Sequence, residues 1–173
     1  MSHIDLDAVF GAMTLHEEMR VAAPVERVWA LVADPTRIGE ISPEATQAEW
    51  LDGAAGPALG ARFRGTNRLG DDVWTRQCTI VELEPGRVFG WEVGDLVDDT
   101  PATRWRFTLE PEGAGATVVR QDFTHLPGGR SRIRLAAERH PERAARYIEK
   151  RGAALADGMR STLARVKEIC EAG

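Results

Sequence analysis

Apolar and polar residues change their spacing twice along the chain, and each spacing predicts a different kind of element. Apolar and polar residues alternate over residues 14–21, which predicts a first strand. The apolar positions of residues 25–32 then recur at helical spacing. Asp34-Pro35 ends that helix, because a residue before proline avoids the α region. Asp34 can also cap a second short helix over residues 35–41. The start of the chain therefore predicts one strand followed by two short helices.

The middle of the chain alternates with a period of two. Turn-forming Gly, Pro and Asp residues divide it at short intervals, which leaves no room for the helical crossovers of a parallel sheet. This stretch predicts an antiparallel meander of six strands, at residues 45–51, 60–69, 72–83, 87–94, 103–110 and 115–126.

The end of the chain returns to helical spacing. A short helix is expected over residues 131–139, and apolar residues then recur every three or four positions from Pro141 to about Glu171. We therefore predict an α+β fold, in which a curved antiparallel sheet of about seven strands wraps around the long C-terminal helix. Residues 14–173 are expected to form a single domain. Residues 1–13 are expected to be a loosely held lead-in, in which Ile4, Leu6, Val9 and Phe10 could form one helical turn against the body.

Four short segments carry a family resemblance. They are Ala-Pro-Val-Glu-Arg-Val-Trp at 23–29, Ala-Asp-Pro at 33–35, Gly-Ala-Arg-Phe-Arg-Gly at 60–65 and Glu-Pro-Gly-Arg at 84–87. Together with the order of elements, they resemble the START-like superfamily called SRPBCC. That group includes polyketide cyclases and dehydrases, lipid-transport-like proteins and the birch pollen allergen. The resemblance covers residues 14–171 and implies a helix-grip fold that encloses a cavity between sheet and helix.

Composition and charge narrow the class of protein. Of 173 residues, 43% are hydrophobic and 28% are charged, which excludes a disordered or fibrous chain. The net charge of −5 disfavours a nucleic-acid partner. Cys78 and Cys170 form neither a disulfide framework nor a metal-ligand spacing, and no apolar run is long enough to span a membrane. We expect a cytoplasmic monomer or homodimer without metal or cofactor.

Strand parity selects the side chains that face the implied cavity. One slip in register would reverse the assignment for a strand, and close packing of the same residues is an equally open alternative. The inward set is predicted to bind a ligand, with Phe63, Asn67, Trp74, Trp91, Trp105, Phe107, Gln121 and Phe123 on the strands and Gly152, Leu155 and Met159 on the long helix.

Candidate catalytic groups are few. The sequence has no nucleophile elbow, no phosphate-binding glycine loop and no zinc-ligand spacing. His125 lies at the end of the last strand, where it could transfer a proton. Arg76 lies on an inward position, where it needs an anionic partner or must extend its head to water. These two residues are the candidates for a catalytic role.

Three functions are compatible with these features. The first is binding or carriage of a hydrophobic small molecule, such as a lipid or polyketide, in the cavity. The second is a polyketide cyclase or aromatase that uses the same cavity, as the resemblance implies. The third is binding of a protein partner or an anionic surface through segment 130–151, where basic residues outnumber acidic ones by eight to three.

Overall fold

A computed structural model describes residues 4–173 and contains one antiparallel sheet of seven strands. The strands follow the sheet order β1-β7-β6-β5-β4-β3-β2, so the chain forms a meander whose last strand returns beside the first. Their bounds are β1 (Thr14–Val21), β2 (Ala45–Trp50), β3 (Arg62–Leu69), β4 (Asp72–Glu84), β5 (Val88–Gly94), β6 (Pro101–Glu112) and β7 (Ala116–His125).

The two short helices lie between β1 and β2, as predicted. The first is α2 (Val25–Val32). The second is divided into a 3-10 turn, η1 (Pro35–Arg37), and a single α-helical turn, α3 (Ile38–Ile41). The Asp34 carboxylate accepts a hydrogen bond from the Thr36 backbone N–H at 3.0 Å, which is the cap that the sequence predicts.

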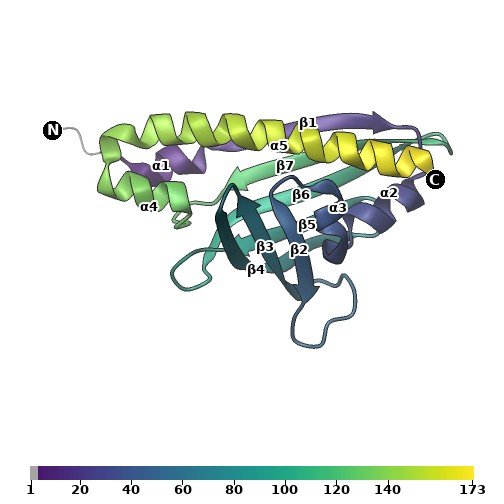
Figure 1. Ribbon diagram of the computed structural model, residues 1–173, viewed down its shortest axis with the longest axis horizontal. Helices are drawn as coiled ribbons and strands as arrows, with labels where there is room; N and C mark the ends of the chain where they lie inside the picture. The colour runs from purple at the N-terminus through teal and green to yellow at the C-terminus, as the bar shows by residue number, and fades with distance from the viewer. Residues whose placement is uncertain (1–3) are drawn as a thin grey trace.

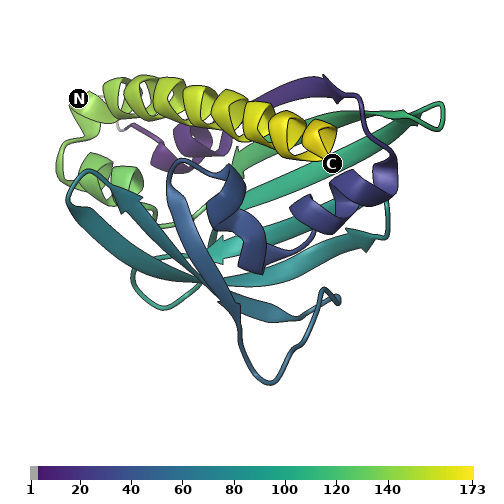
Figure 2. The same cartoon turned by 45° about the vertical axis from the view of Figure 1, so that its right-hand side comes forward.

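The long C-terminal helix α5 (Ala144–Ala172) has 29 residues. It follows α4 (Arg132–Arg139) and a 3-10 turn, η2 (Pro141–Arg143), which occupies the predicted start of the long helix. Figures 1 and 2 show α5 lying across the open side of the curved sheet, with α4 near its start and α2 near its end. The predicted helix-grip architecture is confirmed.

The N-terminal helix α1 (Leu6–Gly11) is packed more firmly than the sequence predicts. The expected helical turn is present, and the Asp5 carboxylate caps it by accepting from the backbone N–H groups of Asp7 and Ala8. Phe10 is completely buried against Ala137 of α4 and Ala144 of α5. Residues 6–11 therefore form the expected helical turn against the body, held more firmly than a loose lead-in because Phe10 is buried. Residues 1–3 of the expected lead-in lie outside the described residues.

Packing between the sheet and the helices differs along the length of α5. At the end nearer the C-terminus, α2 fills the space, and Val28 and Leu31 pack with Phe107 and Val166 in the main core. At the other end, Leu155 and Met159 contact a smaller cluster around Phe123. There α1 contacts β7 and α5, but none of its residues lines the space next to Leu155 and Met159. The fold therefore leaves open space between the sheet and the middle of α5.

Candidate functional site

A cavity of about 690 Å³ lies between the inner face of the sheet and α5. Its walls come from strands β2 to β7, from α3 and the segment after it, and from the middle of α5. One end is bordered by the β3–β4 and β5–β6 turns and by the start of α4. The volume is within the range of known small-molecule pockets, which is roughly 300–1,000 Å³.

Aromatic rings form the sheet side of the cavity. Trp91, Trp105 and Phe123 occupy one row of directly paired positions on β5, β6 and β7. The two indole rings lie nearly parallel, with centroids 6.4 Å apart, and Phe123 meets Trp105 edge-on at 4.9 Å. Neighbouring rings hold each other in fixed orientations, so this wall presents flat apolar faces to the cavity.

A gap in this wall lies at Gly65 of β3. A Cβ atom built at this residue would have no other heavy atom within 4 Å. Gly65 lines the cavity opposite its partner Arg76 on β4, so the missing side chain leaves room that any larger residue would occupy. The cavity therefore depends on this glycine for part of its volume.

Nine of the eleven side chains that were predicted to bind a ligand do line the cavity. They are Phe63, Asn67, Trp74, Trp91, Trp105, Gln121, Phe123, Leu155 and Met159. The catalytic candidates Arg76 and His125 line it as well. The parity assignments were therefore correct for these residues. The register shifts of the sheet lie outside the stretches that carry them, between Ala45 and Gln47, Ile80 and Glu82, and Val93 and Gly94. That these residues bind a ligand stays a prediction.

Phe107 and Gly152 do not line the cavity, which corrects the prediction for both. Phe107 points to the correct face but is completely buried, and its ring lies 5.8 Å from that of Trp91 in the main core. Gly152 is only half-buried and lies about 100° around the helix from Arg151, at the margin of the lining face. Parity and helical phase give the direction of a side chain but not its depth.

Gln121 places a side-chain carbonyl oxygen without a hydrogen-bond partner among the apolar residues of the cavity wall. Its Oε1 is the one buried side-chain nitrogen or oxygen in residues 4–173 without a hydrogen-bond partner. The residue is only 5% exposed. Buried polar atoms normally have partners, so this carbonyl can accept a hydrogen bond from a water or from a ligand in the cavity.

Both ring nitrogens of His125 form hydrogen bonds with nearby residues. Its ring is completely buried, and burial lowers its pKa, which favours the neutral form. Its Nδ1 lies 3.0 Å from the Leu126 carbonyl oxygen, so Nδ1–H donates there, and Nε2 accepts from the Ser131 hydroxyl at 2.8 Å. Both ring nitrogens are thus occupied, which leaves no free position for proton transfer.

Cys78 lines the cavity but is not a nucleophile. Burial raises the pKa of its thiol to about 12, so the thiolate is scarcely populated at neutral pH. Cys78 is therefore a small apolar residue of the core.

Ion pairs surround the cavity and use much of the basic segment. Glu44, just before β2, binds Arg151 of α5 with N–O distances of 2.8 and 3.0 Å. Asp72 on β4 lies 3.4 Å from Arg132, whose guanidinium stacks over Trp74 at 5.0 Å. Other arginines of segment 130–151 also have carboxylate partners: Arg130 with Asp95 and Asp98, Arg134 with Asp7 and Glu138, and Arg143 with Glu142.

Sequence reasoning missed several of these lining residues. Glu44, Asp95 and Ser131 carry no pattern that marks them, since they lie in loops or at caps. Arg132 and Arg151 had one usable signal, which was their place in a basic segment next to the predicted cavity helix. Their acidic partners are 60 and 107 positions away in the chain, so only the folded structure brings them together.

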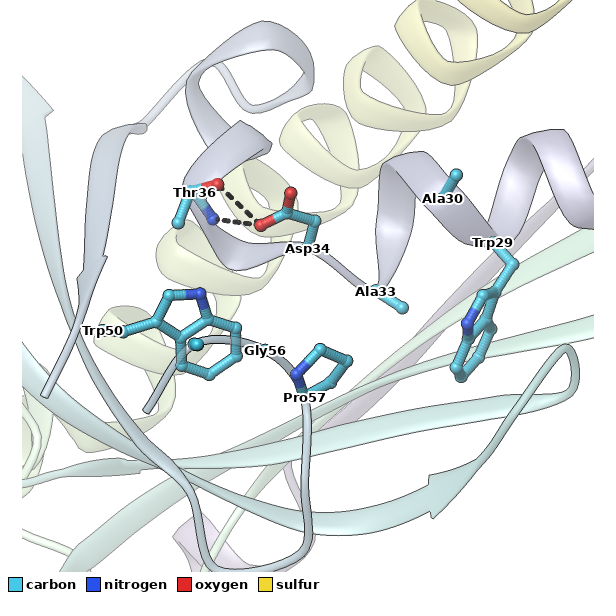
Figure 3. A pocket seen from close by; sticks show the side chains of 9 residues that line it. Trp29, Ala30, Ala33, Asp34, Thr36, Trp50, Gly56 and Pro57 are labelled. Atoms are coloured by element: carbon cyan, nitrogen blue, oxygen red, sulfur yellow. Dashed lines mark hydrogen bonds between the residues drawn. The ribbon is translucent and has the colours of Figure 1, made fainter. Parts of the chain in front are cut away.

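A second hollow of about 450 Å³ lies outside the sheet, between α2 and the β2–β3 loop. Figure 3 shows Trp50 and Trp29 on opposite sides of it, with Pro57 between them. Its only ionisable group is Asp34, whose carboxylate already accepts from Thr36. This hollow therefore offers mainly apolar surface, and its one ionisable group is already hydrogen-bonded.

Two features are absent from residues 4–173, a metal site and a membrane-spanning helix. No group of three His, Cys, Asp or Glu side chains in this part of the chain could hold a metal ion. None of its helices is both long and apolar enough to cross a membrane.

The chain belongs to the family described as "Polyketide cyclase / dehydrase and lipid transport", whose pattern matches residues 12–171. A solved Polyketide_cyc-like protein, Cgl2372 from Corynebacterium glutamicum, is 33% identical, with 92% of this chain and 91% of that chain covered and a TM-score of 0.68. Protein Ms6760 from Mycobacterium smegmatis is 18% identical, with 94% of each chain covered and a TM-score of 0.63. No curated protein matched the sequence.

A third similar structure is BexL, a di-domain ARO/CYC protein from the BE-7585A biosynthetic pathway. It is 19% identical, with 90% of this chain covered and a TM-score of 0.56. This chain spans only 45% of BexL. At such identity the likeness shows the fold alone.

Proposed function

We propose that this protein binds and carries a hydrophobic small molecule in the cavity between the sheet and α5. The observation that carries the proposal is an aromatic-walled space of about 690 Å³ whose lining surface is mainly apolar. Burial of apolar ligand surface contributes about 25 cal/mol per Å², and rigid indole faces suit a planar or extended guest. A cytoplasmic location and a monomeric or homodimeric state remain parts of this proposal, with two free cysteines in support of a reducing compartment.

A cyclase that acts by confinement is the second candidate. The family description favours it, and so does Gln121, whose amide could orient a polar chain. The states of His125 and Cys78 argue for carriage instead. His125 has no free ring nitrogen, and the Cys78 thiol stays protonated. Binding through segment 130–151 is the least supported function, because most of its arginines already have carboxylate partners.

Native mass spectrometry of protein purified from its own host tests carriage. We expect one apolar adduct per chain, released on denaturation and identified by its mass. Repeated recovery of adduct-free protein that also fails to bind neutral aromatic probes would refute carriage. Conversion of a polyketide surrogate, lost in a cavity variant, would favour the cyclase.

A further inference from the structure

Arg76 stands out among the charged groups that line the cavity. It faces inward on β4 between Trp74 and Cys78, and it is half-buried. The only hydrogen bond of its guanidinium within residues 4–173 is from Nη1 to the backbone oxygen of its neighbour Thr75, at 2.5 Å. A guanidinium has five N–H donors, so most of its capacity is unused.

All four carboxylates that line the cavity are already paired with other arginines. The pairs are Glu44 with Arg151, Asp72 with Arg132, Asp95 with Arg130, and Asp157 with Arg160. None of these carboxylates lies within 4.0 Å of Arg76. In the described part of the chain, Arg76 is thus the one arginine of the cavity wall that has no ionic partner.

The surroundings of Arg76 make its positive charge unfavourable in free energy. Burial, followed by the nearby Arg132 guanidinium, lowers the pKa of Arg76, while Asp99 and Asp95 act weakly in the opposite direction. Asp95 is held by Arg130 at 2.8 Å, and Asp99 accepts a hydrogen bond from Gln77 at 3.2 Å. A partly buried charge normally finds a counter-charge, and here the protein supplies none in direct contact.

We infer that the ligand of this cavity carries a carboxylate, and that Arg76 binds it. A planar guanidinium can donate two parallel hydrogen bonds to a carboxylate, which gives both affinity and a fixed orientation. The apolar part of the ligand then lies along the Trp91 and Trp105 faces. This inference rests on the proposed function, since it names the chemical class of the molecule that the cavity takes.

Two tricyclic compounds of similar shape test it, one with a carboxylate and one with a neutral carboxamide. Binding of anthracene-2-carboxylate and of the neutral anthracene-2-carboxamide is measured by fluorescence titration at pH 7.5, in wild type and in Arg76→Met. We expect wild type to bind the acid at least ten times more tightly than the amide. Arg76→Met should lose that preference and keep its affinity for the amide, which also shows that the variant is folded. Arg76→Lys should keep part of the preference.

Arg68→Met is the matched control, since Arg68 is exposed on the outer face of the adjacent strand. It should behave as wild type. Equal binding of acid and amide by wild type, or an unchanged preference in Arg76→Met, would overturn the inference while leaving carriage intact. If wild type bound neither compound nor a neutral probe, the proposed function itself would fail, and the inference with it.

Discussion

Glu44 and Arg151 form a bidentate ion pair that connects the start of β2 to α5 beside the cavity. The N–O distances are 2.8 and 3.0 Å, and both side chains are about three-quarters shielded from solvent, with exposed fractions of 26% and 27%. β2 is the last strand at its edge of the sheet and is paired only with β3. The pair therefore ties a free edge of the sheet to the helix and holds the cavity wall in place.

A double-mutant cycle measures what this pair contributes. Glu44→Gln and Arg151→Met, singly and together, should give a coupling free energy of about 1–2 kcal/mol in urea unfolding, since the pair is bidentate and partly shielded. The exposed pair Arg165–Glu168 is the control, with an expected coupling below about 0.5 kcal/mol. Equal coupling in the two pairs would contradict a structural role for Glu44 and Arg151.

Gln121→Met should stabilise the ligand-free protein. The substitution keeps the length of the side chain and removes a buried carbonyl that has no partner, so the free energy of unfolding should rise by about 1 kcal/mol. Urea unfolding of delipidated protein measures it, with the exposed Gln47→Met as the control. A loss of stability in Gln121→Met would mean that the amide has a structural partner, such as a bound water.

The stability of the protein should fall when the pH drops from 7 to 5, partly because of His125. Burial lowers its folded pKa, whereas the unfolded chain binds a proton near the usual value of 6.5. Below that pH the unfolded state gains protons that the folded state resists, so folding is weakened. Urea unfolding at several pH values should show a smaller decline in His125→Gln than in wild type.

Titration of the Asp98 carboxyl group does not affect the comparison of wild type with His125→Gln between pH 7 and 5. The pKa of Asp98 is lowered to about 2 by hydrogen bonds from Thr100 and Arg130, so its effect on stability appears only as the pH falls through about 4. Parallel pH profiles of wild type and His125→Gln between pH 7 and 5 would show that His125 is not the titrating group.

The fold could be predicted from the sequence because its elements are regular. Alternation placed each strand end to within two residues of its observed position, and strand parity put Gln121, Phe123 and Trp105 on the correct face. The helical stripe likewise placed Leu155 and Met159 opposite the sheet. Local periodicity is sufficient for such assignments, since each depends only on near neighbours in the chain.

The depth and the charge pattern of the cavity could not be predicted in this way. Phe107 shares a face with Trp105 but lies in the solid core, because α2 fills that end of the sheet. The partners Glu44 and Arg151 are 107 positions apart, and their contact depends on how strongly the sheet curves toward α5. Such features arise from tertiary packing, which no short sequence window contains.

Filling the cavity tests the central claim most directly. Gly65→Phe places a ring in the open space at β3, whereas Gly152→Phe adds the same ring to α5 outside the cavity lining. Fluorescence titration with the uncharged probe N-phenyl-1-naphthylamine should show binding to wild type and Gly152→Phe, and at least tenfold weaker binding to a folded Gly65→Phe. Undiminished binding to Gly65→Phe would show that the probe does not enter the cavity, and would contradict the account.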